Sequence, residues 1–208
     1  MNKYVEYFMN SHEGYNLNDH DNCIKAVKKD GYLLKYVKEQ TPEICLAAIN
    51  KNGWTLTYVK EQTPEMCMLA VKQNGLFLKY VKEQTYDICL TAIKQDPAAL
   101  QYVKEQTPEL CLIAVDKESC TLEYVKKQTE ELCSIAVNKD GWALEYVKKQ
   151  TEEICLTAVK QNGWVLEYVN KQTYNICLEA IKENKDAIKH VDKERFPEIH
   201  EIWRLMYE

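Results

Sequence analysis

The apolar residues of this chain recur in one fixed order, every 22 residues. In the copy PEICLAAINK, which begins at Pro42, an arc of roughly 140° on a helical wheel contains Ile44, Cys45, Ala48 and Ile49. A threonine before the proline is a good N-cap, and proline suits the first helical position. A glycine follows two residues after the last lysine, where helices commonly end. The segment is therefore predicted to be a short helix with one buried face.

A second apolar pattern follows each such glycine. In the copy that runs from Trp54 to Gln62, one side of a helix would hold Leu56, Tyr58 and Val59. Charges at positions 57 and 61 change sign together between copies, as in Lys35 with Glu39, Lys79 with Glu83, Glu123 with Lys127, Glu145 with Lys149, and Glu167 with Lys171. Because residues four apart are neighbours on a helix, this exchange favours a second helix through position 61.

Two helices within 22 residues leave almost no loop, so successive helices must pack antiparallel and successive copies must stack. The fold class is therefore predicted to be all-α, an α-solenoid of eight 22-residue two-helix repeats between Asp19 and Glu194. Residues 1–18 depart from the pattern and are predicted to form an N-terminal cap. Residues 195–208 are predicted to form a C-terminal capping helix. We expect these parts to make one continuous domain.

One cysteine recurs in every copy: Cys23, Cys45, Cys67, Cys89, Cys111, Cys133, Cys155 and Cys177. Stacked helices lie roughly 8–10 Å apart, whereas a disulfide needs α-carbons within about 7 Å. Metal sites built from cysteines usually contain close pairs such as C-x-x-C, and the chain has none. We therefore predict a structural ladder of free thiols in the core. Cys120 lies outside the ladder, at the position that holds Trp54, and is predicted to be the most accessible thiol.

Composition restricts the classes of partner. The net charge is −5 and the pI is about 5.5, which argues against general affinity for nucleic acid or anionic membranes. No apolar run approaches the ~20 residues that span a bilayer, and the first residues lack the apolar core of a signal peptide. With nine cysteines, these features lead us to expect a reducing compartment, the cytoplasm.

The units YVKEQTPEICLAAINKNGW and YVKKQTEEICLTAVKQNGW resemble a family of tandem helical repeats, a domain of unknown function that is abundant in giant DNA viruses and some bacteria. The resemblance covers Asp19 to about Glu194. It implies the repeat fold and a viral or microbial source, which would place the protein in the cytoplasm of a host cell. It implies no catalytic residue.

Candidate partner-binding residues lie where the copies differ. The aromatic positions are Tyr32, Trp54, Trp142 and Trp164, and the neighbouring polar positions are Thr57, Glu145 and Glu167. Such an aromatic stripe either anchors a partner or covers the seams between layers, and the helical spacing favours the second interpretation. Position 47, which also varies, is predicted to face solvent.

The expected function is that of a non-enzymatic scaffold that binds another protein through an extended surface. It would engage or block a host or defence protein. The alternative is binding of single-stranded RNA by the tyrosine and lysine ladders, Tyr36 to Tyr168 and Lys38 to Lys148, but adjacent glutamates oppose it. His20, between two aspartates, is interpreted as part of a helix cap rather than a metal ligand. We expect no cofactor, no metal and no membrane, and a monomer or a weak homodimer through the terminal caps.

Overall fold

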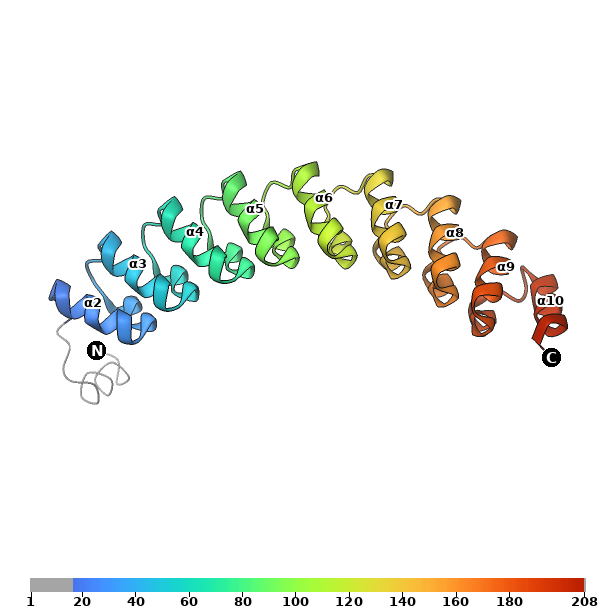
Figure 1. Cartoon of the computed structure of the whole chain (residues 1–208), viewed down its shortest axis with the longest axis horizontal. Helices are drawn as coiled ribbons and strands as arrows, with labels where there is room; N and C mark the ends of the chain where they lie inside the picture. Colours follow the sequence, from blue (N-terminus) through green and yellow to red (C-terminus); the bar gives the residue numbers. More distant parts are fainter. Residues whose placement is uncertain (1–16, 208) are drawn as a thin grey trace. The chain divides into compact units, whose positions relative to one another are not determined.

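The computed structural model of the protein describes residues 17–207 and divides into two compact units (Figure 1). Unit 1 ends at Lys104, and unit 2 begins at Glu105. Within the described part, every element is an α-helix or a 3-10 helix. This confirms an all-α repeat solenoid, while the single continuous domain stays a prediction. The predicted N-terminal cap falls almost entirely outside the described residues.

Each unit contains four helix pairs, in which a ten-residue α-helix is followed by a six-residue 3-10 helix. In unit 1 the elements are α2 (His20–Lys29), η1 (Gly31–Tyr36), α3 (Pro42–Lys51), η2 (Gly53–Tyr58), α4 (Pro64–Gln73), η3 (Gly75–Tyr80), α5 (Tyr86–Gln95) and η4 (Pro97–Tyr102). In unit 2 they are α6 (Pro108–Lys117), η5 (Ser119–Tyr124), α7 (Glu130–Lys139), η6 (Gly141–Tyr146), α8 (Glu152–Gln161), η7 (Gly163–Tyr168), α9 (Tyr174–Glu183), η8 (Lys185–His190) and α10 (Pro197–Tyr207).

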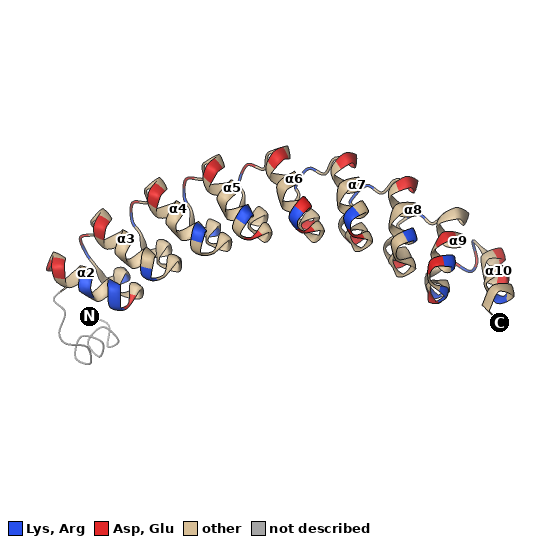
Figure 2. Cartoon of the chain, viewed as in Figure 1, with Lys and Arg blue, Asp and Glu red and all other residues tan. Residues whose placement is uncertain are grey.

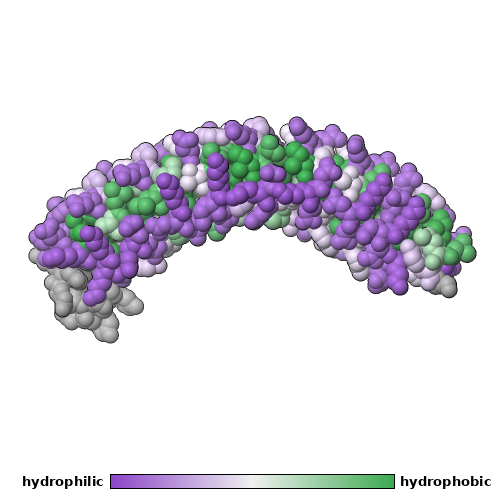
Figure 3. Space-filling view, viewed as in Figure 1, coloured by the Kyte–Doolittle hydropathy of each residue, from purple (hydrophilic) through white to green (hydrophobic). Residues whose placement is uncertain are grey.

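Capping residues set the bounds of the α-helices. The hydroxyl oxygen of Thr41 accepts a hydrogen bond from the backbone N–H of Ile44, and Pro42 occupies the first helical turn of α3. Acidic residues lie in the first turn of α2 to α8 and lysines lie in the last, which suits the helix dipole at both ends (Figure 2). Each unit therefore carries both signs of charge on its surface, and hydrophilic residues cover much of the face seen in Figure 3.

One asparagine or aspartate joins the two helices of most repeats. Asn52 ends α3 in an extended conformation, and its N–H donates to the carbonyl of Ala48 over 2.9 Å. Its side-chain oxygen then accepts from the N–H of Trp54, 3.0 Å away, and so caps η2. A single residue therefore closes the α-helix and opens the 3-10 helix, which explains the very short connection.

The predicted second helix, Trp54 to Gln62, is wrong in type and length. The observed η2 has the i to i+3 hydrogen bonds of a 3-10 helix and ends at Tyr58, because Val59 is extended. Positions 57 and 61 therefore do not share a helix, and among the described residues no ion pair joins them. Nothing in the structure explains the joint exchange of their charges.

Small residues bring successive layers close together. Within each unit the α-helices lie side by side and the 3-10 helices form a second row (Figure 1). The alanine of each α-helix is fully buried, and a Cβ added to Gly31 would lie 2.9 Å from the carbonyl oxygen of Ala48 in the next repeat. The prediction that position 47 faces solvent is wrong for most copies: this position is half-buried in every copy except Lys25, which is exposed.

The recurring glutamine before each α-helix links two layers. The amide of Gln40 donates to the carbonyl oxygens of Leu34 (3.2 Å) and of Tyr58 in the next repeat (3.1 Å). Its oxygen accepts from the N–H of Lys60 at 3.0 Å and from the thiol of Cys45 at 3.9 Å. One glutamine therefore joins two layers and satisfies backbone groups near the ends of both 3-10 helices.

A second set of glutamines, which was not predicted from the sequence, links the far ends of the α-helices. The oxygen of Gln73 accepts from the N–H of Gly53 at 2.7 Å, while its amide donates to the carbonyl of Ile49, also at 2.7 Å. Gln161 forms the equivalent bonds to Gly141 and Val137 in unit 2. Each bond joins a repeat to the one before it.

The C-terminal helix closes the last repeat, as predicted. Phe196 and Ile199 are buried against it. The indole N–H of Trp203 donates to the carbonyl of Lys185 at 2.7 Å, and the hydroxyl of Tyr207 donates to the carbonyl of Ile181 at 2.9 Å. These bonds satisfy carbonyls of the last repeat that no following layer covers.

Candidate partner-binding face

The aromatic and charged candidates lie on the row of 3-10 helices. Here the 3-10 face of unit 1 means the side chains of Tyr32, Lys35, Trp54, Tyr58, Lys79 and Tyr80. The 3-10 face of unit 2 means those of Trp142, Glu145, Trp164, Glu167 and Tyr168. Thr57, another candidate, is exposed on η2.

On unit 1, one tryptophan is held between three tyrosines. The ring of Trp54 lies 5.3 Å from that of Tyr32, 5.1 Å from that of Tyr58 and 6.0 Å from that of Tyr80, measured between centroids. Its indole N–H also donates to the hydroxyl of Tyr80 at 2.7 Å. Trp54 is therefore half-buried across a seam between layers, whereas Tyr32 remains 47% exposed.

Lysines lie over two of the tyrosine rings on the 3-10 face of unit 1. The ammonium of Lys35 lies 5.8 Å from the ring centroid of Tyr58, and that of Lys79 lies 4.7 Å from that of Tyr80. A cation over an aromatic face is attracted by the ring quadrupole. The rings of Tyr58 and Tyr80 therefore already have a cation from the chain itself.

Unit 2 repeats the aromatic pairs with different neighbours. The ring of Trp142 packs 6.0 Å from that of Tyr168, and the ring of Trp164 packs 5.3 Å from that of His190. Trp142 is 44% exposed, whereas Trp164 is half-buried. The ammonium of Lys189 lies 5.5 Å from the Trp164 centroid.

Carboxylates replace the lysines on the rest of the unit 2 face. Glu123, Glu145 and Glu167 occupy one repeat position in three successive 3-10 helices, and all three are exposed. Burial, then the charges of Glu145 and Glu167, raise the pKa of the Tyr168 hydroxyl above its ordinary value. The two carboxylates therefore both act on one aromatic residue beside Trp142.

The same residue type at the same repeat position has different surroundings. Trp54 is covered because Tyr32 occupies the equivalent position in the preceding repeat and the hydroxyl of Tyr80 accepts a hydrogen bond from its indole N–H. Trp142 follows a repeat that has Cys120 there, and it stays exposed. The aromatic stripe thus contains both a tryptophan packed in a seam and an exposed one. Neither of the two interpretations, seam packing or partner binding, fits all its residues.

Four segments of the chain match the family described as Domain of unknown function (DUF4116): residues 41–85, 63–107, 129–174 and 151–195. These segments cover more than half of the chain, and within each pair the starts are 22 residues apart. The chain belongs to this family. Each DUF4116 match spans about two of the repeats seen in the structure. No curated protein and no solved structure matches the chain.

The cysteine of each DUF4116 repeat is a core residue, as predicted. All eight ladder thiols are free and buried. Burial raises the pKa of each, and it raises those of Cys155 and Cys177 to about 11. Such thiols are poor nucleophiles and poor metal ligands at neutral pH.

Cys120 is expected to be the only one of nine thiols that reacts rapidly with Ellman's reagent in the folded protein, because it alone is exposed. Its pKa is raised by partial burial and by the carboxylates of Glu118, Asp140 and Glu123. The reaction should therefore be slower than that of free cysteine and should accelerate above pH 9. Absorbance at neutral pH should show one rapid thiol per chain, and Cys120→Ser should remove it. A rapid phase of two or more thiols would contradict this exposure pattern.

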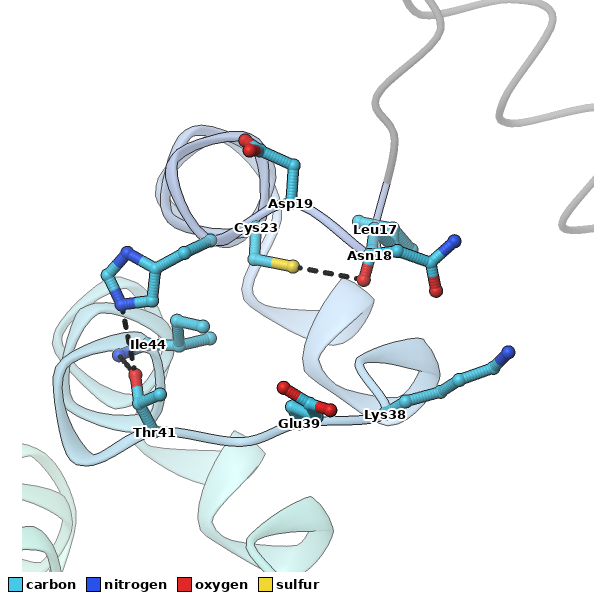
Figure 4. Close-up of a pocket in the computed structure, with 9 residues that line it drawn as sticks. Leu17, Asn18, Asp19, Cys23, Lys38, Glu39, Thr41 and Ile44 are labelled. Carbon is cyan, nitrogen blue, oxygen red and sulfur yellow. Dashed lines mark hydrogen bonds between the residues drawn. The ribbon is translucent and has the colours of Figure 1, made fainter.

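A small pocket of about 150 Å³ lies at the start of unit 1, beside α2 (Figure 4). Asp19 caps α2 by accepting from the N–H of Asn22, and a His20 ring nitrogen lies 3.3 Å from the hydroxyl of Thr41. The thiol of Cys23 donates to the carbonyl of Leu17. Several polar groups around this pocket are thus hydrogen-bonded to groups of the chain, in agreement with the predicted cap.

Residues 17–207 contain neither a metal-binding group of side chains nor a membrane-spanning helix. Within that range no three His, Cys, Asp or Glu side chains are grouped so as to hold a metal ion. In the same range no helix has the length and apolar character needed to cross a membrane.

Proposed function

We propose that this protein is a non-enzymatic repeat scaffold that binds another protein through its 3-10 faces. The observation that carries the proposal is the contrast between interior and face. Core alanines, cysteines and glutamines repeat, whereas the 3-10 faces change in both ring and charge from one repeat to the next. An exposed tryptophan beside carboxylates on unit 2 is the kind of residue that anchors protein interfaces.

The free cysteines and the resemblance of the repeats to those of giant DNA viruses support a setting for the proposed function. We propose a cytoplasmic location, in the host cell for a viral protein, and a partner among host or defence proteins that would be engaged or blocked. The outer side of α10 exposes Leu205 and Met206, which suits a weak homodimer through the terminal cap.

The lysine ladder bears on the RNA alternative. The ammonium of Lys60 donates to the carbonyl of Lys38 at 2.7 Å, and that of Lys82 donates to the carbonyl of Lys60 at 2.8 Å. In unit 2, Lys148 donates to the carbonyl of Val125. Ammonium groups that satisfy backbone carbonyls are less available to phosphates, which favours a protein partner over RNA.

Affinity capture from the native cytoplasm, followed by mass spectrometry, tests the proposed function. We expect the wild-type protein to retain a partner that the variant Tyr32→Ala/Trp142→Ala does not retain. Leu112→Ala is the matched control, since this side chain is also large and 42% exposed but lies on α6.

Three outcomes would count against the proposed function. The first is that the wild-type protein retains nothing at micromolar concentration. The second is that the control loses the partner as completely as the double variant does. The third is that nuclease treatment releases whatever is captured, which would support the RNA alternative.

A further inference from the structure

The last repeat shows how the 3-10 face accommodates a cation. Lys189 occupies the position equivalent to Thr57 and places its ammonium 5.5 Å from the ring centroid of Trp164 in the preceding repeat. Of the aromatic residues, tryptophan attracts a cation over its ring most strongly. The chain thus contains its own example of a basic side chain bound on this face.

One repeat earlier, the same arrangement lacks its cation. The residue that corresponds to Lys189 is Glu167, so Trp142 has a carboxylate where Trp164 has an ammonium. Trp142 remains 44% exposed. The repeat position of Glu167 is also acidic in the two preceding 3-10 helices, where it is Glu145 in η6 and Glu123 in η5. An aromatic ring flanked by carboxylates attracts a cation both through the ring quadrupole and by charge.

Unit 1 offers the contrast that makes the arrangement specific to unit 2. There Lys35 and Lys79 already cover the rings of Tyr58 and Tyr80. Among the described residues of unit 2, the carboxylate of Glu167 has one basic neighbour within 4 Å, His190, whose Nε2 lies 3.7 Å from it. That imidazole is half-buried and carries a charge only when protonated.

We propose that the 3-10 face of unit 2 binds a basic polypeptide segment, with a lysine or arginine over Trp142 and further basic residues on successive repeats. This inference rests on the proposed function and names the chemistry of the partner. The charge complementarity of Glu123, Glu145 and Glu167 with that segment selects it over an acidic or purely apolar partner.

The repeat spacing fixes the spacing of the basic residues. Layers of stacked helices lie roughly 8–10 Å apart. A polyproline II segment rises about 3.1 Å per residue with three residues per turn, so every third side chain lies on one side, about 9 Å apart. A segment with a basic residue at every third position therefore presents one cation to each repeat.

Fluorescence anisotropy with a labelled peptide of four Ala-Pro-Lys triplets tests the inference, using the full chain at roughly 0.05 M salt, where charge contacts are weakly screened. The variant Glu145→Gln/Glu167→Gln should bind about tenfold more weakly, the order expected for two charge contacts beside an aromatic ring. The matched control is Glu130→Gln/Glu131→Gln, which removes two exposed carboxylates from the first turn of α7 and should change the affinity less than about twofold. Trp142→Ala should weaken binding as the first variant does.

Several results would overturn the inference. Equal weakening by both double variants would indicate attraction by net charge alone. Equal binding of a peptide with its four lysines in one block would remove the spacing argument. Sedimentation velocity that shows a dimer lost in Lys35→Gln/Lys79→Gln would identify a second copy as the occupant.

The peptide assay and the capture experiment separate the two proposals. A partner captured by wild-type protein and retained by Glu145→Gln/Glu167→Gln would leave the proposed function standing and reject the basic segment. Capture of nothing by the wild-type protein would count against the proposed function itself.

Discussion

Raising the pH from 9 to 11 is expected to lower the free energy of unfolding by several kcal/mol. Burial holds the pKa of Cys155 and Cys177 near 11 in the folded chain, against an ordinary value of 9.0. Below pH 9 both states keep the proton. Between pH 9 and 11 the unfolded chain loses it while the folded chain retains it, so stability falls as the pH rises.

The magnitude follows from the size of the two shifts. A shift of about two pKa units corresponds to on the order of 2–3 kcal/mol for each thiol, reached as the pH passes the folded-state pKa. The other six ladder thiols also have raised pKa values and act in the same direction. We therefore expect the buried ladder to make the fold sensitive to alkali.

Urea unfolding at pH 8, 9, 10 and 11, with a reductant present throughout, measures this effect. Cys155→Ala/Cys177→Ala should be less stable at pH 8, because it leaves cavities, but should lose less stability between pH 9 and 11. Cys120→Ser serves as the control, since Cys120 is exposed and its replacement should change the pH dependence much less than the double variant does. An identical pH dependence in all three proteins would show that the ladder thiols do not contribute.

The repeat fold could be predicted from the sequence because the same apolar spacing recurs in every repeat. The 22-residue period identifies the stacking unit, and the helical wheel places cysteine and alanine in the core, where the structure has them. The capping threonine and proline locate the start of α3 correctly. These are local signals, and their recurrence from repeat to repeat makes them clear.

The type of the second helix, α or 3-10, could not be predicted because its apolar spacing fits both. Leu56 and Val59 are three apart, which suits one side of an α-helix and equally suits a 3-10 helix followed by an extended residue. The backbone hydrogen bonds distinguish the two helix types. Which bonds form depends on the distance that the backbone spans between one layer and the next. The bridging role of Gln73 was missed for a similar reason, since its partner Gly53 lies 20 residues away in sequence.

The candidate face could be predicted only as a set of positions. Sequence reasoning placed Trp54 and Trp142 in one stripe, but the structure half-buries the first and leaves the second 44% exposed. The difference comes from side chains of adjacent repeats, Tyr32 and Tyr80 around Trp54, which a single repeat does not reveal. The cation over Trp164 is likewise a contact between repeats.

Replacement of Gln128 by alanine should destabilise unit 2 by about 2–4 kcal/mol, since each lost hydrogen bond costs roughly 1 kcal/mol and buried groups lose their partners. The amide of Gln128 donates to the carbonyls of Leu122 (3.0 Å) and Tyr146 (2.8 Å). Its oxygen accepts from the N–H of Lys148 at 2.9 Å and from the thiol of Cys133 at 3.6 Å. One side chain therefore serves four groups in two layers.

Urea unfolding at pH 7 measures the loss, and Lys127→Ala provides the control on the preceding, exposed residue, where about 0.5 kcal/mol or less is expected. Gln128→Glu separates the two halves of the network. Its carboxylate can still accept from Lys148 and Cys133 but no longer donates to the two carbonyls, so this variant should also be destabilised at pH 7. It should recover part of the loss below about pH 4, where the protonated acid donates again. If Gln128→Ala loses no more stability than Lys127→Ala, the glutamine does not hold the layers together, and the stack depends on its apolar core alone.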